Sequence, residues 1–263
     1  MTTIAVIPAR YDSTRFPGKP LAQDTGKYLI EHVYERATRA ACVDRVIVAT
    51  DDERIFEAVR SFGGEVQMTR ADHPNGTHRV AEVASGLDLG RDDIVFNIQG
   101  DEPELDPRIL DKLVALLKLG PTMRIATPAA RFADDGPTEG RGSPADPACV
   151  KVVVGTDGRA LYFSRSLIPY PRATNGRVDR PSRWLLHLGV YAFRADVLRT
   201  IIEAPCGPRD GLDAVESLEQ LHWLWLGFGI GVVVVEHRHA GIDTPEEYAA
   251  FVQRTLAATP RPE

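Results

Sequence analysis

Apolar residues along the first hundred positions follow two alternating spacings. Short continuous apolar runs, typical of strands buried on both faces, occupy residues 4–7, 45–49, 65–68 and 94–98. Between these runs, apolar residues recur at helical spacing over residues 30–41, 54–62 and 77–87. Repeated strand–helix units predict an α/β fold, with a mostly parallel central sheet flanked by helices on both faces and right-handed crossovers.

The pattern changes in the second half of the chain. A helix is expected at residues 107–117, and residues 133–148 form a loop rich in Gly, Pro and Asp with no apolar period. Strand signals follow at residues 150–154, 160–163 and 184–193, with an Asp-Gly turn at 156–159 and an irregular stretch at 169–183. Helices near 195–204 and 213–226, a strand at 231–235 and a helix from Pro245 are expected after them. We therefore predict one domain over residues 1–263 with a strand-rich insertion at about 149–194.

The composition is that of a globular protein with a full core and disfavours a nucleic-acid partner. Hydrophobic residues make up 43% of the chain and charged residues 26%. The formal net charge is −6, whereas binding along a nucleic acid requires a basic face that neutralises phosphates. Small molecules are therefore the more suitable partners.

Several features predict a cytoplasmic protein without a membrane segment. No apolar run reaches the roughly 18 residues of a membrane span. Residues 1–3 lead directly into the first predicted strand, without a charged leader. Cys42, Cys149 and Cys206 lie far apart and form no C-x-x-C pair, which argues against a disulfide framework or a zinc cluster and is typical of a reducing compartment.

The loop after the first strand, with the sequence IPARYDSTRFPGKPL at residues 7–21, suits a polyphosphate. Arg10, Arg15 and Lys19 are separated by Pro and Gly residues that restrict the loop. Arg offers a planar fork for phosphate oxygens and Lys a point charge. In an open α/β sheet, ligands bind beyond the carboxyl ends of the strands. A solvated basic loop is the alternative interpretation.

Carboxylates at two separate positions are candidate metal ligands. Asp101 and Glu102 follow the strand at residues 94–98, and Asp243 precedes the last predicted helix. Mg²⁺ takes one or two protein carboxylates, and phosphate and water complete its shell. The alternative is that these acids only cap the helices that begin near Pro107 and Pro245.

A third candidate is the turn-rich loop TRADHPNGT at residues 69–77, which enters a predicted helix. Its backbone amides and small side chains are suited to recognising the edge of a nucleobase, as helix N-termini recognise anions. An ordinary strand-to-helix loop is the alternative.

Taken in order, these blocks resemble the CMP-Kdo synthetases, the 3-deoxy-manno-octulosonate cytidylyltransferases of the sugar-nucleotidyltransferase superfamily. The resemblance runs over nearly the whole chain. It rests on IPARYDSTRFPGKPLA (7–22), MTRADHPNGT (68–77), NIQGDEP (97–103), VKVV (150–153), LYFSRSLIP (161–169), HLGVYAFR (187–194), LEQL (218–221) and GIDTPEE (241–247).

The resemblance implies a single-domain, Rossmann-like nucleotidyltransferase that is a homodimer through its strand-rich segment. It implies CTP as co-substrate and Mg²⁺ as the metal. CMP would be transferred to an acidic acceptor, foremost 3-deoxy-manno-octulosonate, with release of pyrophosphate. Its partners would be small molecules, with no nucleic acid and no membrane.

The resemblance also implies roles for residues in these blocks. The catalytic residues would be Arg10, Lys19, Asp101 and Asp243, of which Asp101 and Asp243 would ligate Mg²⁺. CTP would be bound by Ala9, Arg10, Arg15, Lys19, Arg70, Asp72, Gly76, Thr77 and Gln99. The acceptor would be bound by Gln99, Arg165, His187, Tyr191, Glu219 and Gln220.

Departures from the family pattern leave other functions open. Leu186 and His222 stand where the family usually has Arg, His78 stands where it has Glu, and the loop at 133–148 is atypical. One alternative is a cytidylyltransferase acting on a small phosphonate such as phosphonoformate. Others are a non-catalytic nucleotide-binding module and a glycosyltransferase, which would normally show Asp-x-Asp where this chain has Gly100-Asp101-Glu102.

Overall fold

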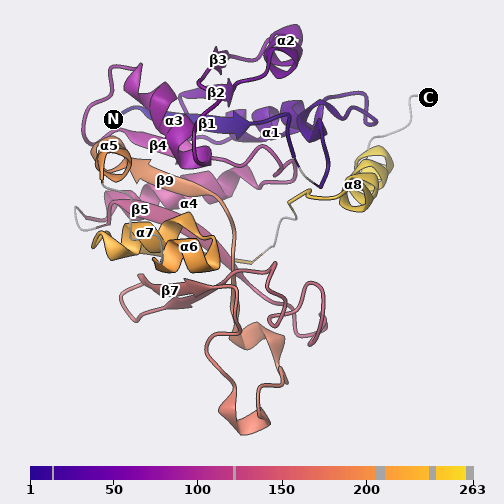
Figure 1. Ribbon diagram of the computed structural model, residues 1–263, viewed down its shortest axis with the longest axis vertical. Helices are drawn as coiled ribbons and strands as arrows, with labels where there is room; N and C mark the ends of the chain where they lie inside the picture. The colour runs from indigo at the N-terminus through magenta and orange to yellow at the C-terminus, as the bar shows by residue number, and fades with distance from the viewer. Residues whose placement is uncertain (14, 121–122, 205–210, 237–240, 259–263) are drawn as a thin grey trace. The chain divides into compact units, whose positions relative to one another are not determined.

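The computed structural model describes residues 1–13, 15–120, 123–204, 211–236 and 241–258 (Figure 1). They form two compact units. The first consists of residues 1–111 together with the C-terminal segment from residue 239, and the second of residues 112–238. In the described part of the chain, no helix combines the length and the apolar character needed to cross a bilayer.

The first unit is built on a parallel sheet of four strands. These are β1 (Thr3–Ala9), β2 (Arg45–Thr50), β3 (Val66–Met68) and β4 (Ile94–Asn97), in the order β3-β2-β1-β4. The helices α1 (Leu29–Thr38), α2 (Glu53–Ser61) and α3 (Gly76–Ser85) pack against these strands. The short 3₁₀ helix η1 (Lys19–Leu21) and helix α8 (Pro245–Ala258) belong to the same unit, and α4 (Pro107–Lys118) begins in it. The alternating strands and helices predicted for this part are confirmed.

Because all four strands are parallel, their carboxyl ends lie at one edge of this sheet. The apolar runs are buried throughout β1 and β4 because helices cover the sheet. The loop that carries Arg10 and Arg15 follows β1, the loop at residues 69–75 follows β3, and Asp101 follows β4. The fold therefore brings the three sequence blocks to the same edge.

The second unit is a mixed sheet with helices. Its strands are β5 (Ile125–Arg131), β6 (Lys151–Val154), β7 (Ala160–Ser164), β8 (Leu185–His187), β9 (Tyr191–Arg194) and β10 (Ile230–Val235). Their order is β9-β5-β8-β6-β7, and β10 pairs parallel with β5. Its helices are α5 (Ala195–Glu203), α6 (Leu212–Glu216) and α7 (Glu219–Trp225), and the 3₁₀ turns η2 (Arg172–Thr174) and η3 (Pro181–Arg183) lie in the stretch predicted to be irregular. The predicted hairpin of β6 and β7 is confirmed.

Two predicted elements of this unit are each divided in two. The strand expected at 184–193 is interrupted at residues 188–190, because β8 and β9 pair with different parts of β5. The helix expected at 213–226 is broken at Ser217, which has a left-handed backbone with φ of 51° and separates α6 from α7. Both interruptions preserve apolar residues on either side, so the hydrophobic pattern did not reveal them.

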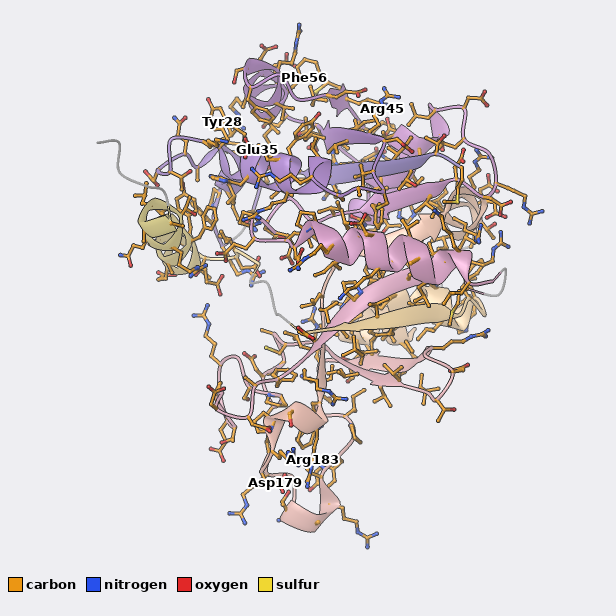
Figure 2. The ribbon with its side chains drawn as sticks, turned by 180° about the vertical axis from the view of Figure 1, so that it is seen from behind. Tyr28, Glu35, Arg45, Phe56, Asp179 and Arg183 are labelled. Atoms are coloured by element: carbon orange, nitrogen blue, oxygen red, sulfur yellow. The ribbon has the colours of Figure 1, made fainter. Side chains whose placement is uncertain are left out.

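Substitution of Phe96 should test how strongly the core of the first unit determines stability. Phe96 on β4 is fully buried, so Phe96→Ala should lower the free energy of unfolding by about 3–5 kcal/mol. Phe56→Ala is the matched control, because Phe56 on α2 is only half-buried (Figure 2). Chemical denaturation should show a much smaller loss for Phe56→Ala. Equal losses would contradict this account of the core.

Candidate active site

The described residues of the loop between β1 and η1 are held by contacts within the loop and by one contact from α2. The Tyr11 carbonyl accepts hydrogen bonds from the amides of Gly18 (2.9 Å) and Ser13 (3.0 Å). Gly18 has φ of 71°, and a Cβ there would lie 3.1 Å from the Tyr11 ring, so the position requires glycine. The guanidinium of Arg54, on α2, lies over the Tyr11 ring, 3.3 Å from its centroid. The contacts therefore preorganise the part of this loop around Tyr11 and Gly18.

Lys19 is where the predicted cations and acids meet. Its side chain is 10% exposed, and its Nζ donates to Asp101 Oδ2 at 2.7 Å and to the Ile242 carbonyl at 2.6 Å. The same Nζ lies 3.5 Å from Asp243 Oδ1, which Arg15 Nη2 approaches to 3.0 Å. The Lys19 ammonium group thus joins the segment after β4 to a segment more than two hundred positions away from Lys19.

Asp243 is available for this contact because another residue caps α8. Thr244 Oγ1 accepts from the Glu247 amide at 3.3 Å, and the Glu247 carboxylate accepts from the amides of Asp243 (2.8 Å) and Thr244 (3.1 Å). This is a capping box in which Thr244 has the N-cap role. The interpretation of Asp243 as the cap of this helix is therefore wrong.

The loop that carries Asp101 is fixed in a similar way. A Cβ on Gly100 would lie 3.1 Å from the Pro8 carbonyl, so the chain passes β1 at a distance that disfavours a side chain. The Asp101 carbonyl accepts from the Ile242 amide at 2.9 Å. Asp106, rather than Asp101, accepts from the Arg108 amide at 3.0 Å at the start of α4. Asp101 is thus not the residue that caps α4.

A small apolar cluster holds the segment before α8, which carries Asp243, against the loop between β1 and η1. Leu29, Ile242, Tyr248 and Phe251 are buried together, and Phe16 packs against them. The Tyr248 hydroxyl also accepts from the Asp24 amide at 2.8 Å. The position of Asp243 therefore depends on the packing of α8.

The carboxylates of Asp101 and Asp243 fit a divalent cation that also binds phosphate. Both face the same ammonium group, so both are oriented toward one small region beside cationic side chains. Within the described residues, no group of three or more His, Cys, Asp and Glu side chains is arranged to hold a metal. Two carboxylates whose remaining partners are phosphate oxygens and water are the ligand set that Mg²⁺ prefers.

The loop at residues 69–77 brings small groups close to Gln99. Thr77 is buried, and its Oγ1 accepts from Asn97 Nδ2 at 3.2 Å, while Asn97 Oδ1 accepts from Gln99 Nε2 at 3.2 Å. A Cβ on Gly76 would lie 4.0 Å from Gln99 Nε2. Gly76, Thr77 and Gln99 are therefore neighbours, as a shared role in binding requires.

Arg70, Asp72 and Ala9 occupy different surroundings. The side chains of Arg70 and Asp72 are exposed and lie 3.7 Å apart, as Nε and Oδ1. Ala9 is buried at the end of β1. Arg10, which follows it, is exposed and donates from Nη2 to the His73 carbonyl at 2.5 Å. This bond joins the two loops.

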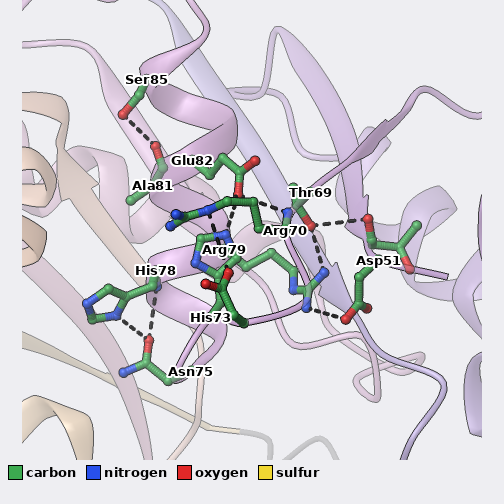
Figure 3. Close-up of polar contacts among 12 residues, drawn as sticks. Asp51, Thr69, Arg70, His73, Asn75, His78, Arg79, Ala81, Glu82 and Ser85 are labelled. Carbon is green, nitrogen blue, oxygen red and sulfur yellow. Dashed lines mark hydrogen bonds and ion pairs between the residues drawn. The ribbon is translucent and has the colours of Figure 1, made fainter.

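The sequence did not reveal the charged residues that lie beneath the loop at 69–77 (Figure 3). Arg79 is fully buried on α3, and its guanidinium donates to Thr69 Oγ1 at 2.6 Å and lies 3.0 Å from Asp51 Oδ2. An arginine inside the apolar stripe of a predicted helix is the signal that could have identified it, because a buried charge requires a partner.

His187 and Tyr191 are part of an aromatic group in the second unit. The His187 ring lies 5.0 Å from the Phe163 centroid and 5.3 Å from the Tyr191 centroid, and Tyr191 packs edge-on against Trp223 at 4.8 Å. Burial lowers the pKa of His187 to about 3, so the imidazole is neutral at physiological pH. The Thr127 hydroxyl donates to the Val190 carbonyl at 2.8 Å, so its oxygen accepts from His187 Nε2–H at 3.0 Å. His187 Nδ1 is then an acceptor.

Tyr191 contributes a polar group to these apolar surroundings. Its hydroxyl is buried and has no hydrogen-bond partner among the described residues. Burial, and then the charge of Glu219, raise the pKa of Tyr191 well above its ordinary value. Since a buried hydroxyl without a partner is costly, this position is suited to a ligand that carries a hydrogen-bonding group.

Arg165, Glu219 and Gln220 lie around the junction of α6 and α7. Arg165 donates from Nε to the Glu216 carbonyl at 2.7 Å and from Nη1 to the Pro147 carbonyl at 3.1 Å. Glu219 begins α7, and the neighbouring Gln220 is buried. Arg165 therefore has backbone partners that hold this junction, whatever else it binds.

The atypical residues have structural surroundings of their own. Leu186 is buried on β8, opposite Ala130 and Lys151. The His222 ring stacks on Trp225 at 5.6 Å. The stretch at 133–148 contains neither helix nor strand, as predicted. Leu186 is thus a core side chain.

The sequence of this chain is similar to those of known cytidylyltransferases. A family model described as cytidylyltransferase matches residues 4–231. A 3-deoxy-manno-octulosonate cytidylyltransferase from Syntrophobacter fumaroxidans is 48% identical over 252 residues, which cover 96% of each chain. One from Syntrophotalea carbinolica is 46% identical, covering 94% of this chain and 96% of the relative.

A solved structure shares both sequence and fold. The structure of CMP:2-keto-3-deoxy-manno-octonic acid synthetase complexed with CTP has a TM-score of 0.86 and 40% identity, covering 98% of this chain and all of that one (100%). The predicted α/β nucleotidyltransferase fold is thereby confirmed. The chain belongs to the cytidylyltransferase family and, within it, to the 3-deoxy-manno-octulosonate cytidylyltransferases.

Proposed function

We propose that this protein transfers CMP from CTP to 3-deoxy-manno-octulosonate and releases pyrophosphate. The observation that carries the proposal is the meeting of Asp101 and Asp243 at Lys19, at the edge of a sheet where α/β proteins bind ligands. The names of the relatives, and that of the solved structure with CTP, support the same reaction.

The reaction requires charge neutralisation rather than a covalent nucleophile. The 2-hydroxyl oxygen of the acceptor attacks the α-phosphorus of CTP, the bond from that phosphorus to the β-phosphate oxygen breaks, and the hydroxyl proton passes to solvent. Arg10, Arg15 and Lys19 would hold the triphosphate and stabilise the charge that develops on the leaving pyrophosphate. Mg²⁺ bound by Asp101 and Asp243 would supply further neutralisation and lower the pKa of the attacking hydroxyl.

The remaining residues would select the two substrates. Gly76, Thr77 and Gln99 would contact the nucleotide from their shared position, with Ala9, Arg70 and Asp72 in the flanking segments. His187, as a neutral acceptor, and the unpartnered Tyr191 hydroxyl support acceptor binding in the second unit, together with Arg165, Glu219 and Gln220.

Tyr191→Phe should separate acceptor binding from stability. Because the hydroxyl has no partner among the described residues, its removal should leave the melting temperature unchanged or raise it. The KM for 3-deoxy-manno-octulosonate should rise about tenfold, since a hydrogen bond to the ligand is lost. Tyr162→Phe on β7, where the ring is half-buried, is the control. An unchanged KM would remove Tyr191 from the acceptor site.

Pyrophosphate release tests the proposed reaction. The protein, CTP and MgCl₂ would be assayed with 3-deoxy-manno-octulosonate and, in parallel, with phosphonoformate. We expect release with the sugar acid alone. Release with phosphonoformate alone would favour the phosphonate alternative, which the names of the relatives do not support.

Two further features of the protein are part of the proposal. A homodimer formed through the segment at 149–194 is supported by Leu161 on β7, whose side chain is 63% exposed, and light scattering would report its mass. A cytoplasmic location is supported by Cys42, Cys149 and Cys206, which lie far apart in the sequence and form no C-x-x-C pair; Cys206 lies outside the described residues.

A further inference from the structure

Glu82, on the second turn of α3, contacts two residues of the loop at 69–77 through one oxygen. Its Oε2 accepts from the Arg70 amide at 3.2 Å and is hydrogen-bonded to His73 Nε2 (Figure 3). Because an ionised carboxylate has no proton to donate, His73 Nε2–H is the donor and Glu82 Oε2 the acceptor. One carboxylate oxygen therefore fixes both the backbone at Arg70 and the ring of His73.

The His73 ring has little freedom to adopt another position. Its side chain is 3% exposed, and the buried N–H would be left without an acceptor if Glu82 were absent. Burial alone raises the pKa of Glu82. The hydrogen bonds from His73 and the Arg70 amide, together with the charges of His73 and Arg70, lower this pKa on balance. The carboxylate is thus ionised at neutral pH and binds its two donors with charge-assisted hydrogen bonds.

The backbone of the same histidine contacts Arg10, in the loop between β1 and η1, which we call the triphosphate loop. The His73 carbonyl accepts from Arg10 Nη2 at 2.5 Å. The orientation of this carbonyl follows from the backbone at His73, which the ring and Glu82 hold in place. A continuous path therefore runs from Glu82 through His73 to Arg10.

The other fixed points of the loop lack this connection. Thr69 is bound by Arg79, and Asn75 Oδ1 accepts from the His78 amide at 3.0 Å, which caps α3. These contacts hold the two ends of the loop. Glu82 acts on its middle, where the bond to Arg10 lies.

We propose that Glu82 is a positioning residue that links the loop at 69–77, the nucleobase loop, to the triphosphate loop. The two loops would then form a single preformed site for CTP. This inference rests on the proposed function, since it assumes that Arg10 contacts the triphosphate. It assigns Glu82 a role in nucleotide affinity without any contact to the nucleotide.

The test measures CTP binding by titration calorimetry, without acceptor, for the wild type and for Glu82→Ala, Glu82→Gln, Arg10→Met and the double variant Glu82→Ala/Arg10→Met. We expect Glu82→Ala to weaken CTP binding by about 10- to 100-fold, the range for charge-assisted hydrogen bonds. Glu82→Gln keeps an acceptor oxygen and should weaken it less. In the double variant the two effects should combine to less than their product, because both changes break the same path.

Asp93→Ala is the matched control. The Asp93 carboxylate also accepts from two backbone amides, those of Thr2 (2.6 Å) and Gly90 (2.8 Å), but it lies before β4, at the amino end of the strand. It should lower the melting temperature and leave CTP affinity unchanged.

The outcomes distinguish this inference from the proposed function. A wild type that does not bind CTP would overturn the proposed function and the inference with it. A wild type that binds CTP, with Glu82→Ala within about twofold of it or with fully multiplicative effects, would overturn the inference alone. If Glu82→Ala does not fold, the same cycle is run with Glu82→Gln, whose affinity must then fall and couple to Arg10→Met.

Discussion

Asp101→Asn should lower kcat at least about a hundredfold, while CTP binding largely survives. Asn has nearly the same shape and keeps an oxygen that can accept from Lys19 Nζ, so the fold and the cationic loop should persist. The substitution removes the negative charge that, in the proposed function, would hold Mg²⁺ beside the α-phosphorus. Steady-state kinetics with CTP and the sugar acid, combined with titration calorimetry of CTP, would measure both effects.

Asp106→Asn is the control for this substitution. Asp106 lies five residues further along, at the start of α4, where it contacts the exposed side chain of Arg108. Its kinetics should match those of the wild type. An Asp101→Asn variant that lost CTP binding but retained turnover at saturation would contradict the assigned role of Asp101.

Lys19→Met should reduce kcat/KM by about 100- to 1000-fold. Met has a similar length and no charge. The carboxylates of Asp101 and Asp243 would therefore lie near each other without the ammonium group between them. Their repulsion should lower the melting temperature, and Mg²⁺ should raise it more in this variant than in the wild type, because the cation compensates both charges. Kinetics and thermal melts with and without MgCl₂ would measure these effects.

Lys27→Met provides a matched control for the charge that Lys19 loses. Lys27, just before α1, also lies near two carboxylates, those of Glu31 (4.0 Å) and Glu35, but its side chain is 43% exposed. It should leave kcat/KM unchanged, because an exposed ion pair contributes little. If Lys27→Met were as damaging as Lys19→Met, the effect at Lys19 would be one of general stability.

The sequence predicted most of the fold because periodicity reports burial. It missed β5, whose sequence IATPAAR contains Pro128, a residue that normally argues against a central strand. In the structure, β5 pairs with β9 at residues 125–126 and with β8 at residues 129–131. Pro128 lies between these two pairings, where its missing N–H costs little, and such a position cannot be recognised without knowing the neighbouring strands.

The candidate site was predictable to the extent that its residues follow strands. Arg10 comes directly after β1, Lys19 ends the loop that follows β1, and Asp101 follows β4, so their place at one edge follows from parallel topology. Whether Asp243 or Thr244 caps α8 could not be decided from the letters, because both residue types are good caps. The partners of Arg79 and Glu82 were also inaccessible, since they depend on how α3 lies against the loop before it.

The most direct test of the central claim is to identify the product formed from CTP and 3-deoxy-manno-octulosonate in the presence of MgCl₂. Phosphorus NMR would follow the reaction, and mass spectrometry would identify the nucleotide product. We expect equal amounts of pyrophosphate and of a CMP diester of the sugar acid, and at least about a hundredfold slower formation of both with Asp101→Asn. Intact CTP after incubation with the wild-type protein, or hydrolysis to free CMP without a sugar diester, would contradict the account.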